Sequence, residues 1–169
     1  MKIIRNSFIL LLSVIFLFVL VRNFFQYIEN PSSHWDHPEE IPPSYFNRGW
    51  LPQWLPENAT NIYQQHNIDT NQIWVKFEVK RDMTLPKDFT KLNDKHISKL
   101  KIPEPYSAFW WFEGLIQQQP ANDNALSANI FQKEENNLTT YLIIDRTSAI
   151  YYLFSERKNI QDEASFETR

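Results

Sequence analysis

An uncharged apolar run near the N-terminus constrains this chain of 169 residues more than any other feature. Residues 7–21 (SFILLLSVIFLFVLV) contain no charge and no proline, and Arg5 and Arg22 flank them. The run is shorter than the roughly 20 residues that cross a bilayer, but the aliphatic stems of the two arginines can lengthen the span while their charges stay at the interface. Aromatic side chains that suit this interface follow at Phe24, Phe25 and Tyr27. The sequence therefore predicts a transmembrane helix with its flanks over residues 1–29.

Two other interpretations fit an N-terminal apolar run, a cleaved signal peptide and a buried core helix. Signal peptidases need small residues just before the cut, and residues 19–29 (VLVRNFFQYIE) offer none. The chain has no cysteine, which excludes a lipid-modified N-terminus and also excludes disulfides. We therefore expect an uncleaved signal anchor that contacts the membrane through residues 7–21.

The charges around the run predict its orientation. Lys2, Arg5 and the α-amino group precede the span, whereas acidic residues dominate soon after it. Because basic flanks stay in the cytoplasm, the short tail is expected there and the rest of the chain outside. That outer part must fold around an ordinary hydrophobic core, for which the chain supplies six Trp, seven Tyr and thirteen Phe.

Composition excludes two classes of function. Nucleotide-binding loops of the Rossmann or P-loop kind need several glycines at fixed spacing, and the chain has only Gly49 and Gly114. The formal net charge is −3, and the first 29 residues are net basic, so the exported part is more acidic still. Nucleic acid is therefore not an expected partner, and we expect no cofactor.

The exported part is expected to have three regions. Residues 30–49 begin with a proline-rich stretch that predicts an extended linker holding the domain off the membrane. Residues 50–156 carry the folded domain. Residues 157–169 are polar and are expected to fray or to be disordered.

Within the domain, hydrophobic periodicity predicts an α+β fold. Helices are expected at residues 57–67, where Ala59, Ile62 and His66 share a helical face, and at residues 86–100. Strands are expected at residues 72–80, 127–133, 139–145 and 149–155, with turns at 134–137 and 146–148. The aromatic segment 105–118 fits either a short helix ending near Gly114 or an irregular core plug. We expect a mainly antiparallel four-stranded sheet with one or two helices packed on a face.

Two clusters carry side chains that could do chemistry, and each has a plain structural alternative. The segment with His34, Asp36 and His37, followed by Glu39 and Glu40, offers metal ligands, but a mobile linker cannot hold their geometry, so a solvated stalk is favoured. His66 with Asp69 could form an oriented general base for a hydrolase. The chain shows no nucleophile motif to pair with them, so we expect a helix end and no catalysis.

A basic stripe and an aromatic cluster are the better candidates for binding. Lys87, Lys91, Lys95 and Lys99 recur every four residues, which on a helix makes a basic face for an acidic partner or anionic lipid, or else a solvated surface. Aromatic side chains that could line a partner groove or form the core are Trp50, Trp54, Tyr106, Phe109, Trp110, Trp111 and Phe112. We take Trp54, Trp110, Trp111 and the four lysines as the predicted binding residues.

The chain also resembles a group of proteins. The anchor, the segment WLPQWLP at residues 50–56, the residues from Ala59 to Ile62, and IDTN at residues 68–71 before Trp74 resemble small single-pass membrane proteins of Gram-negative bacteria that have no assigned activity. The resemblance covers residues 1–80 and transfers no functional residue. It implies a bacterial inner-membrane protein with its C-terminal domain in the periplasm.

Together these observations favour a non-enzymatic interaction module that meets a protein partner at the periplasmic face. Two alternatives stay open, an immunity or inhibitor protein against a toxin, and a hydrolase that uses His66 and Asp69. An inhibitor should expose an acidic or aromatic patch, whereas a hydrolase should bring titratable groups together in a pocket.

Overall fold

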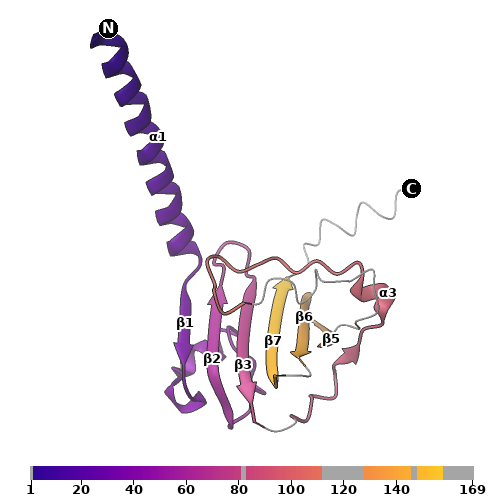
Figure 1. Ribbon diagram of the computed structural model, residues 1–169. Helices are drawn as coiled ribbons and strands as arrows, with labels where there is room; N and C mark the ends of the chain where they lie inside the picture. Colours follow the sequence, from indigo (N-terminus) through magenta and orange to yellow (C-terminus); the bar gives the residue numbers. More distant parts are fainter. Residues whose placement is uncertain (1, 81–82, 112–127, 146–147, 158–169) are drawn as a thin grey trace.

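A computed structural model describes residues 2–80, 83–111, 128–145 and 148–157. Helix α1, Lys2–Glu29, leads directly into a domain built on one sheet (Figure 1). Within the described residues, the segment Leu10–Glu29 has the length and composition needed to cross a membrane, and none of its apolar window is buried. The apolar side chains of this segment are therefore not part of a protein core, and its interpretation as a buried core helix is wrong.

The sheet has seven strands, in the order β1-β2-β3-β7-β6-β5-β4, and every neighbouring pair is antiparallel. Their bounds are β1 Ser32–Trp35, β2 Ala59–His66, β3 Ile73–Val79, β4 Thr90–Lys91, β5 Ala128–Glu135, β6 Leu138–Asp145 and β7 Ile150–Arg157. The expected antiparallel sheet is confirmed, but it has seven strands and not four.

The four predicted strands are confirmed as β3, β5, β6 and β7. In β3 the alternation of Val75 and Phe77 with Trp74 and Lys76 places the two pairs on opposite faces, as a strand requires. Strands β5 and β6 are joined by Asn136 and Asn137, both in the left-handed region (φ 48° and 64°). A two-residue hairpin turn with positive φ at both positions matches the twist of the flanking strands, and Asn tolerates it.

The helix expected at residues 57–67 is wrong, because these residues form β2. The pairing of β2 with β3 shifts between Thr60 and Tyr63, where Asn61 is inserted with φ 54°. This β-bulge puts Ala59 and Ile62, three residues apart, on the same face of the sheet. Apolar residues spaced three apart normally indicate a helix, so the residue inserted at the bulge led to the wrong prediction of a helix.

The extended linker expected at the start of the 30–49 region also differs from the structure. Strand β1 pairs with β2, from Ser32 opposite Gln65 to Trp35 opposite Ile62. A 3₁₀ turn, η1 (Pro38–Glu40), and a short helix, α2 (Pro43–Asn47), follow. The prolines therefore begin short helical turns, which their fixed φ favours, and do not form a stalk.

The helix expected at residues 86–100 is wrong apart from its centre. It is replaced by the two-residue edge strand β4 and by α3, Asp94–Ile97. Asn93 begins α3 because its side chain accepts a hydrogen bond from the backbone N–H of His96 at 3.1 Å. Residues 105–111 are irregular, and the rest of the aromatic segment, Gly114 included, lies outside the described residues.

Segments without regular structure cover both faces of the sheet. On one face, here called the cap face, Ile62, Val75, Phe77, Leu142 and Leu153 form a core with residues from the 41–55 and 83–89 segments. On the other, here called the loop face, Trp74, Ile130, Ile143, Tyr152 and Phe154 pack against residues 92–111. Because both faces are buried, β7 is apolar at every position from Tyr151 to Phe154.

Replacing Phe77 by alanine should destabilise the domain strongly. Its ring is completely buried and stacks on Tyr151 with 5.2 Å between ring centroids. We expect the free energy of unfolding of Phe77→Ala to fall by about 3–5 kcal/mol, measured by denaturant titration in detergent. The matched control is Phe109→Ala, whose side chain is 88% exposed and should cost less than about 0.5 kcal/mol. Similar losses in the two variants would contradict the core described above.

Candidate functional site

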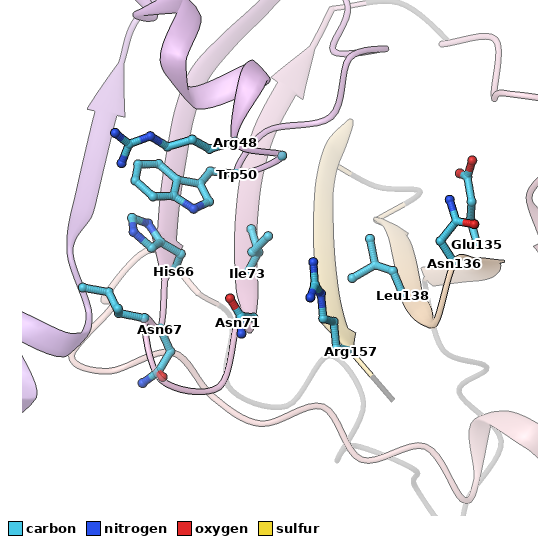
Figure 2. A pocket seen from close by; sticks show the side chains of 12 residues that line it. Arg48, Trp50, His66, Asn67, Asn71, Ile73, Glu135, Asn136, Leu138 and Arg157 are labelled. Atoms are coloured by element: carbon cyan, nitrogen blue, oxygen red, sulfur yellow. The ribbon is translucent and has the colours of Figure 1, made fainter. Parts of the chain in front are cut away.

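A cavity of about 380 Å³ opens on the cap face, at the end of the sheet that α1 enters (Figure 2). Four parts of the chain line it: the segment after α2, the end of β2 with the β2–β3 loop, the β5–β6 turn and the end of β7. Its side chains include Arg48, Trp50, His66, Asn67, Asn71, Ile73, Glu135, Asn136, Leu138 and Arg157. The cavity therefore combines apolar surface with cationic and hydrogen-bonding groups.

Three of these side chains form a stack. The ring of Trp50 lies on the imidazole of His66, with centroids 3.8 Å apart and planes 19° apart. The guanidinium of Arg48 lies over the opposite side of Trp50, 4.7 Å from the ring centroid. The indole is thus held between a cation and an imidazole, which fixes the position of Arg48 at the wall of the cavity.

The end of α2 explains how Trp50 reaches this position. The backbone N–H of Trp50 donates to the carbonyl of Tyr45 at 2.9 Å, and that of Gly49 donates to Phe46 at 3.0 Å. These two bonds form a Schellman motif, in which the residue at the Gly49 position must be left-handed. Its φ of 73° meets this need, so the glycine turns the chain back and presents Trp50 to β2.

His66 is held as a neutral imidazole. It is only 5% exposed, and Gln64 Nε2 lies 3.0 Å from its Nδ1. This contact orients the ring, and the Gln64 amide donates to Nδ1 in the tautomer that carries its proton on Nε2. Burial, and secondarily the charge of Arg48, lower the pKa of His66 below its usual value of 6.5.

The described lining of the cavity carries two arginines and one acid. Arg48 and Arg157 are exposed, and neither forms an ion pair with a residue that the structure describes. The acid in the lining, Glu135, is bound by Lys133 Nζ at 2.7 Å, and Lys133 also contacts Asp88 at 3.3 Å. The hydrogen bond to Glu135 is the main reason that the pKa of Lys133 is raised. Glu135 therefore has a cationic partner, which it shares with Asp88, whereas Arg48 and Arg157 have no ion-pair partner within the described part of the chain.

A second hollow of about 370 Å³ adjoins the first. The two share Gly49, Trp50, Ile73, Glu135 and Leu138 in their linings. Trp54 belongs to the second hollow, and it also packs on the cap-face core beside Phe89, with ring centroids 5.7 Å apart. Of the predicted binding residues, Trp54 is therefore next to the cavity without lining it.

The other predicted binding residues lie elsewhere. Trp110 is 7% exposed and belongs to the loop-face core, while Trp111 packs on Tyr152 with ring centroids 5.5 Å apart. Exposed side chains are found at Lys87, Lys91, Lys95 and Lys99. They are distributed over irregular chain, β4 and α3, so they do not share one helical face. Their role in binding stays a prediction.

The structure does not bring His66 and Asp69 together as a catalytic pair. His66 is bonded to Gln64, whereas Asp69 is exposed in the β2–β3 loop. There its backbone N–H donates to Asn67 Oδ1 at 3.0 Å, and Thr70 donates to the same oxygen. These bonds form an Asx turn, which gives this loop a structural role.

Of the histidines and acids near β1, His34 and Asp36 approach each other. His34 Nε2 lies 3.7 Å from Asp36 Oδ1 and 3.2 Å from Asn61 Oδ1, and its ring stacks on Tyr63. Asp36 is linked to Glu40 through its backbone N–H. Among residues 2–80, 83–111, 128–145 and 148–157, no three His, Asp or Glu side chains are grouped to hold a metal ion.

Sequence reasoning missed the two arginines and the partnership of Trp50 with His66. Arg48 and Arg157 are more than one hundred residues apart in the chain, and no local pattern relates them. The usable signal was Gly49, one of only two glycines. A glycine after a short proline-initiated segment indicates a helix end and a sharp reversal.

Acidification should destabilise the domain through His66. Because the pKa of His66 is lowered by folding, the unfolded chain binds more protons below about pH 6.5, so stability is lost as the pH falls through this value. Between pH 7.5 and 5.5, thermal or denaturant unfolding should show a fall of at most about 1.4 kcal/mol per pH unit.

His66→Gln should flatten this slope, whereas His37→Gln, at an exposed position, should leave it unchanged. An unaltered slope in His66→Gln would show that other groups cause the pH dependence.

The comparison with known families concerns the first part of the domain. The model of the YbbD head domain, a family of Gram-negative bacteria, matches residues 29–78. This segment runs from the end of α1 to Glu78 in β3, and it includes the Arg48–Trp50–His66 stack but not Arg157. The match covers less than half of the chain, so it shows a similarity of this segment. No curated protein and no solved structure matches the chain.

Proposed function

We propose that this protein is a membrane-anchored interaction module that faces the periplasm and has no catalytic activity. Its N-terminal apolar helix and the similarity of residues 29–78 to the YbbD head domain support the anchored bacterial module. The basic flank before the span, with Lys2 and Arg5, supports the outward orientation of the domain.

The observation that carries the proposal is the way α1 joins the domain. The carbonyl of Glu29, the last residue of α1, accepts a hydrogen bond from the backbone N–H of Ile68 at 2.9 Å. Asn30 is buried, and its side chain donates to Gln26 at 2.8 Å and accepts from Asn67 at 2.8 Å. The helix end is thus fixed to the β2–β3 loop, and the domain is held at the membrane surface with one edge toward it.

A protein partner would be met on an exposed aromatic patch formed by His34, Tyr63 and Phe109. The ring of Tyr63 lies between the two, stacked on His34 at 4.2 Å and edge-on to Phe109 at 6.0 Å. Phe109 is 88% exposed and neighbours the predicted residues Trp110 and Trp111. Large aromatic rings at a surface supply contact area at low cost in side-chain entropy, which suits a partner interface.

The other two functions lack such support. The described residues show no contact between His66 and Asp69 that a hydrolase would need. An inhibitor is expected to present an acidic or aromatic patch; the aromatic patch would serve an inhibitor as well as any other interaction module, and the cavity, with Arg48 and Arg157, presents no acidic patch among its described residues. The interaction module is therefore the function that we retain.

Topology is the first test of the proposal. A C-terminal alkaline phosphatase fusion should be active and a green fluorescent protein fusion dark, because the first folds only in the periplasm and the second only in the cytoplasm. The protein should resist carbonate extraction, and its mass should include residues 1–29. A processed chain lacking these residues, or a fluorescent cytoplasmic fusion, would refute the anchored periplasmic arrangement.

Photo-crosslinking tests the partner surface. A photoreactive phenylalanine derivative at Phe109 should capture one protein in living cells, whereas the same group at Glu57, also exposed but away from the aromatic patch, should not. Capture should be lost when Tyr63 is replaced by alanine in the protein labelled at residue 109. Equal capture from both positions, or none from Phe109, would count against a protein-binding patch.

A further inference from the structure

The edge of the sheet next to α1 is the part of the domain that faces the lipid surface. Strands β2 and β7 end at this edge and β3 and β6 begin there, with Ile73 opposite Ser155 and Leu138 opposite Arg157 (Figure 1). Because the carbonyl of Glu29 is bonded to Ile68, the loop after β2 is fixed beside the end of the membrane helix. Groups at this edge are therefore within reach of lipid headgroups.

The composition of this edge suits that location. Ile68 is 55% exposed at the tip of the β2–β3 loop. Exposure of such a large apolar side chain to water is unfavourable. Next to α1 it can enter the membrane interface. Arg157 ends β7 at the same edge, and the polar turn Asn136–Asn137 lies beside it. An apolar tip with nearby cations is the pattern expected of a surface that rests on anionic lipid.

The cavity opens at this edge and contains the groups that a phosphate needs. Arg48 and Arg157 line it from opposite sides in Figure 2, and neither is paired with a described residue. A guanidinium presents parallel N–H donors that match two phosphate oxygens. The imidazole of His66 and the side-chain amide of Asn71 add hydrogen-bonding groups to the lining.

The apolar part of the cavity fits the rest of a lipid headgroup. Trp50, Ile73 and Leu138 provide carbon surface between the polar groups. A glycerol backbone attached to a phosphate would meet this surface, whereas a fully hydrated inorganic ion would not use it. The single acid, Glu135, is paired with Lys133 at 2.7 Å and so repels an anion only weakly.

We propose that this cavity binds the phosphate group of an anionic phospholipid headgroup from the leaflet in which α1 is anchored. This inference rests on the proposed function. It adds that the module binds one lipid as a ligand in the cavity, in addition to being anchored in the membrane by α1. Arg157 binds the phosphate, Arg48 adds its charge from the opposite wall, where the stack with Trp50 holds it in place, and Ile68 enters the interface beside the cavity.

The test uses the full-length protein in nanodiscs made of equal parts phosphatidylglycerol and phosphatidylcholine. After release from the disc, native mass spectrometry counts the lipids that stay bound. The wild type should keep one phosphatidylglycerol in preference to phosphatidylcholine, and Arg48→Gln/Arg157→Gln should lose at least 90% of it. The matched control, Lys80→Gln/Lys101→Gln, removes two exposed charges that are outside the cavity and are not among the predicted binding residues, and it should bind as the wild type does.

Folding of each variant is checked by circular dichroism melting in detergent. If the double variant does not fold, Arg157→Gln alone is used, because its exposed side chain at the end of β7 is not part of a core. It should lose most of the bound lipid. Unchanged lipid retention in a folded arginine variant, equal retention of the two lipids, or no retention by the wild type would overturn the proposal.

Calorimetry distinguishes the two possible sources of the phosphate group, a lipid headgroup and free inorganic phosphate. In detergent, the wild type should bind dihexanoyl-phosphatidylglycerol at least tenfold more tightly than sodium phosphate. Equal affinities would mean that the site takes a soluble phosphate and that the lipid assignment is wrong.

The topology fusions and the carbonate extraction are repeated on the arginine variants. An anchored, outward-facing variant with unchanged lipid retention overturns the lipid site alone, whereas a mislocalised wild type overturns the proposed function.

Discussion

The pairing of β3 with β7 is the interaction on which the rest of the structure depends. It joins the first three strands to the last four, in a register that places Ile73 opposite Ser155 and Phe77 opposite Tyr151. This register stacks the two aromatic rings in the cap-face core. It also brings the end of β7 to the end of β2, so that Arg157 and His66 line one cavity. The site exists only because this long-range pairing forms.

The segments that cover the sheet are mostly irregular and so lack most of the internal hydrogen bonds of helices. Their buried backbone N–H and C=O groups therefore need other partners. Buried side chains of the sheet provide some of these partners. Trp74 Nε1 donates to the carbonyl of Pro103 at 2.8 Å, and Gln65 Nε2 donates to that of Tyr106 at 2.9 Å. These bonds fasten the loop-face segment while its apolar side chains fill the core. The second bond also gives the buried amide of Gln65 a hydrogen-bond partner.

The direct junction of α1 with the sheet changes how the module relates to the membrane. A flexible linker would let the domain rotate and would give no edge a preference for the lipid surface. Bonds from Ile68 to Glu29 and from Asn67 to Asn30 restrict this freedom. In the proposed anchored arrangement one end of the sheet stays near the headgroups, which would raise the effective concentration of lipid at the cavity without any increase in intrinsic affinity. Anchor and proposed ligand site thus act as one unit.

The sequence by itself determined the elements whose physical signal is local. The apolar run of α1 and the alternating or fully apolar patterns of β3, β5, β6 and β7 all reflect burial or lipid contact along a single segment. Only the tertiary structure decided the elements that depend on a partner. Ser32–Trp35 became β1 because β2 supplies its hydrogen bonds, and the bulge at Asn61 made β2 resemble a helix in sequence.

The candidate site belongs to the second group. Glycine at position 49 signalled a chain reversal, but which side chains the reversal would bring together was not encoded nearby. Arg48, His66 and Arg157 line one cavity because the β2–β3 and β3–β7 pairings align the ends of β2 and β7 and the reversal at Gly49 brings the segment after α2 to β2. Local patterns report the environment of a residue along its own segment, whereas a binding site is set by the register between segments, and that register was decided by packing.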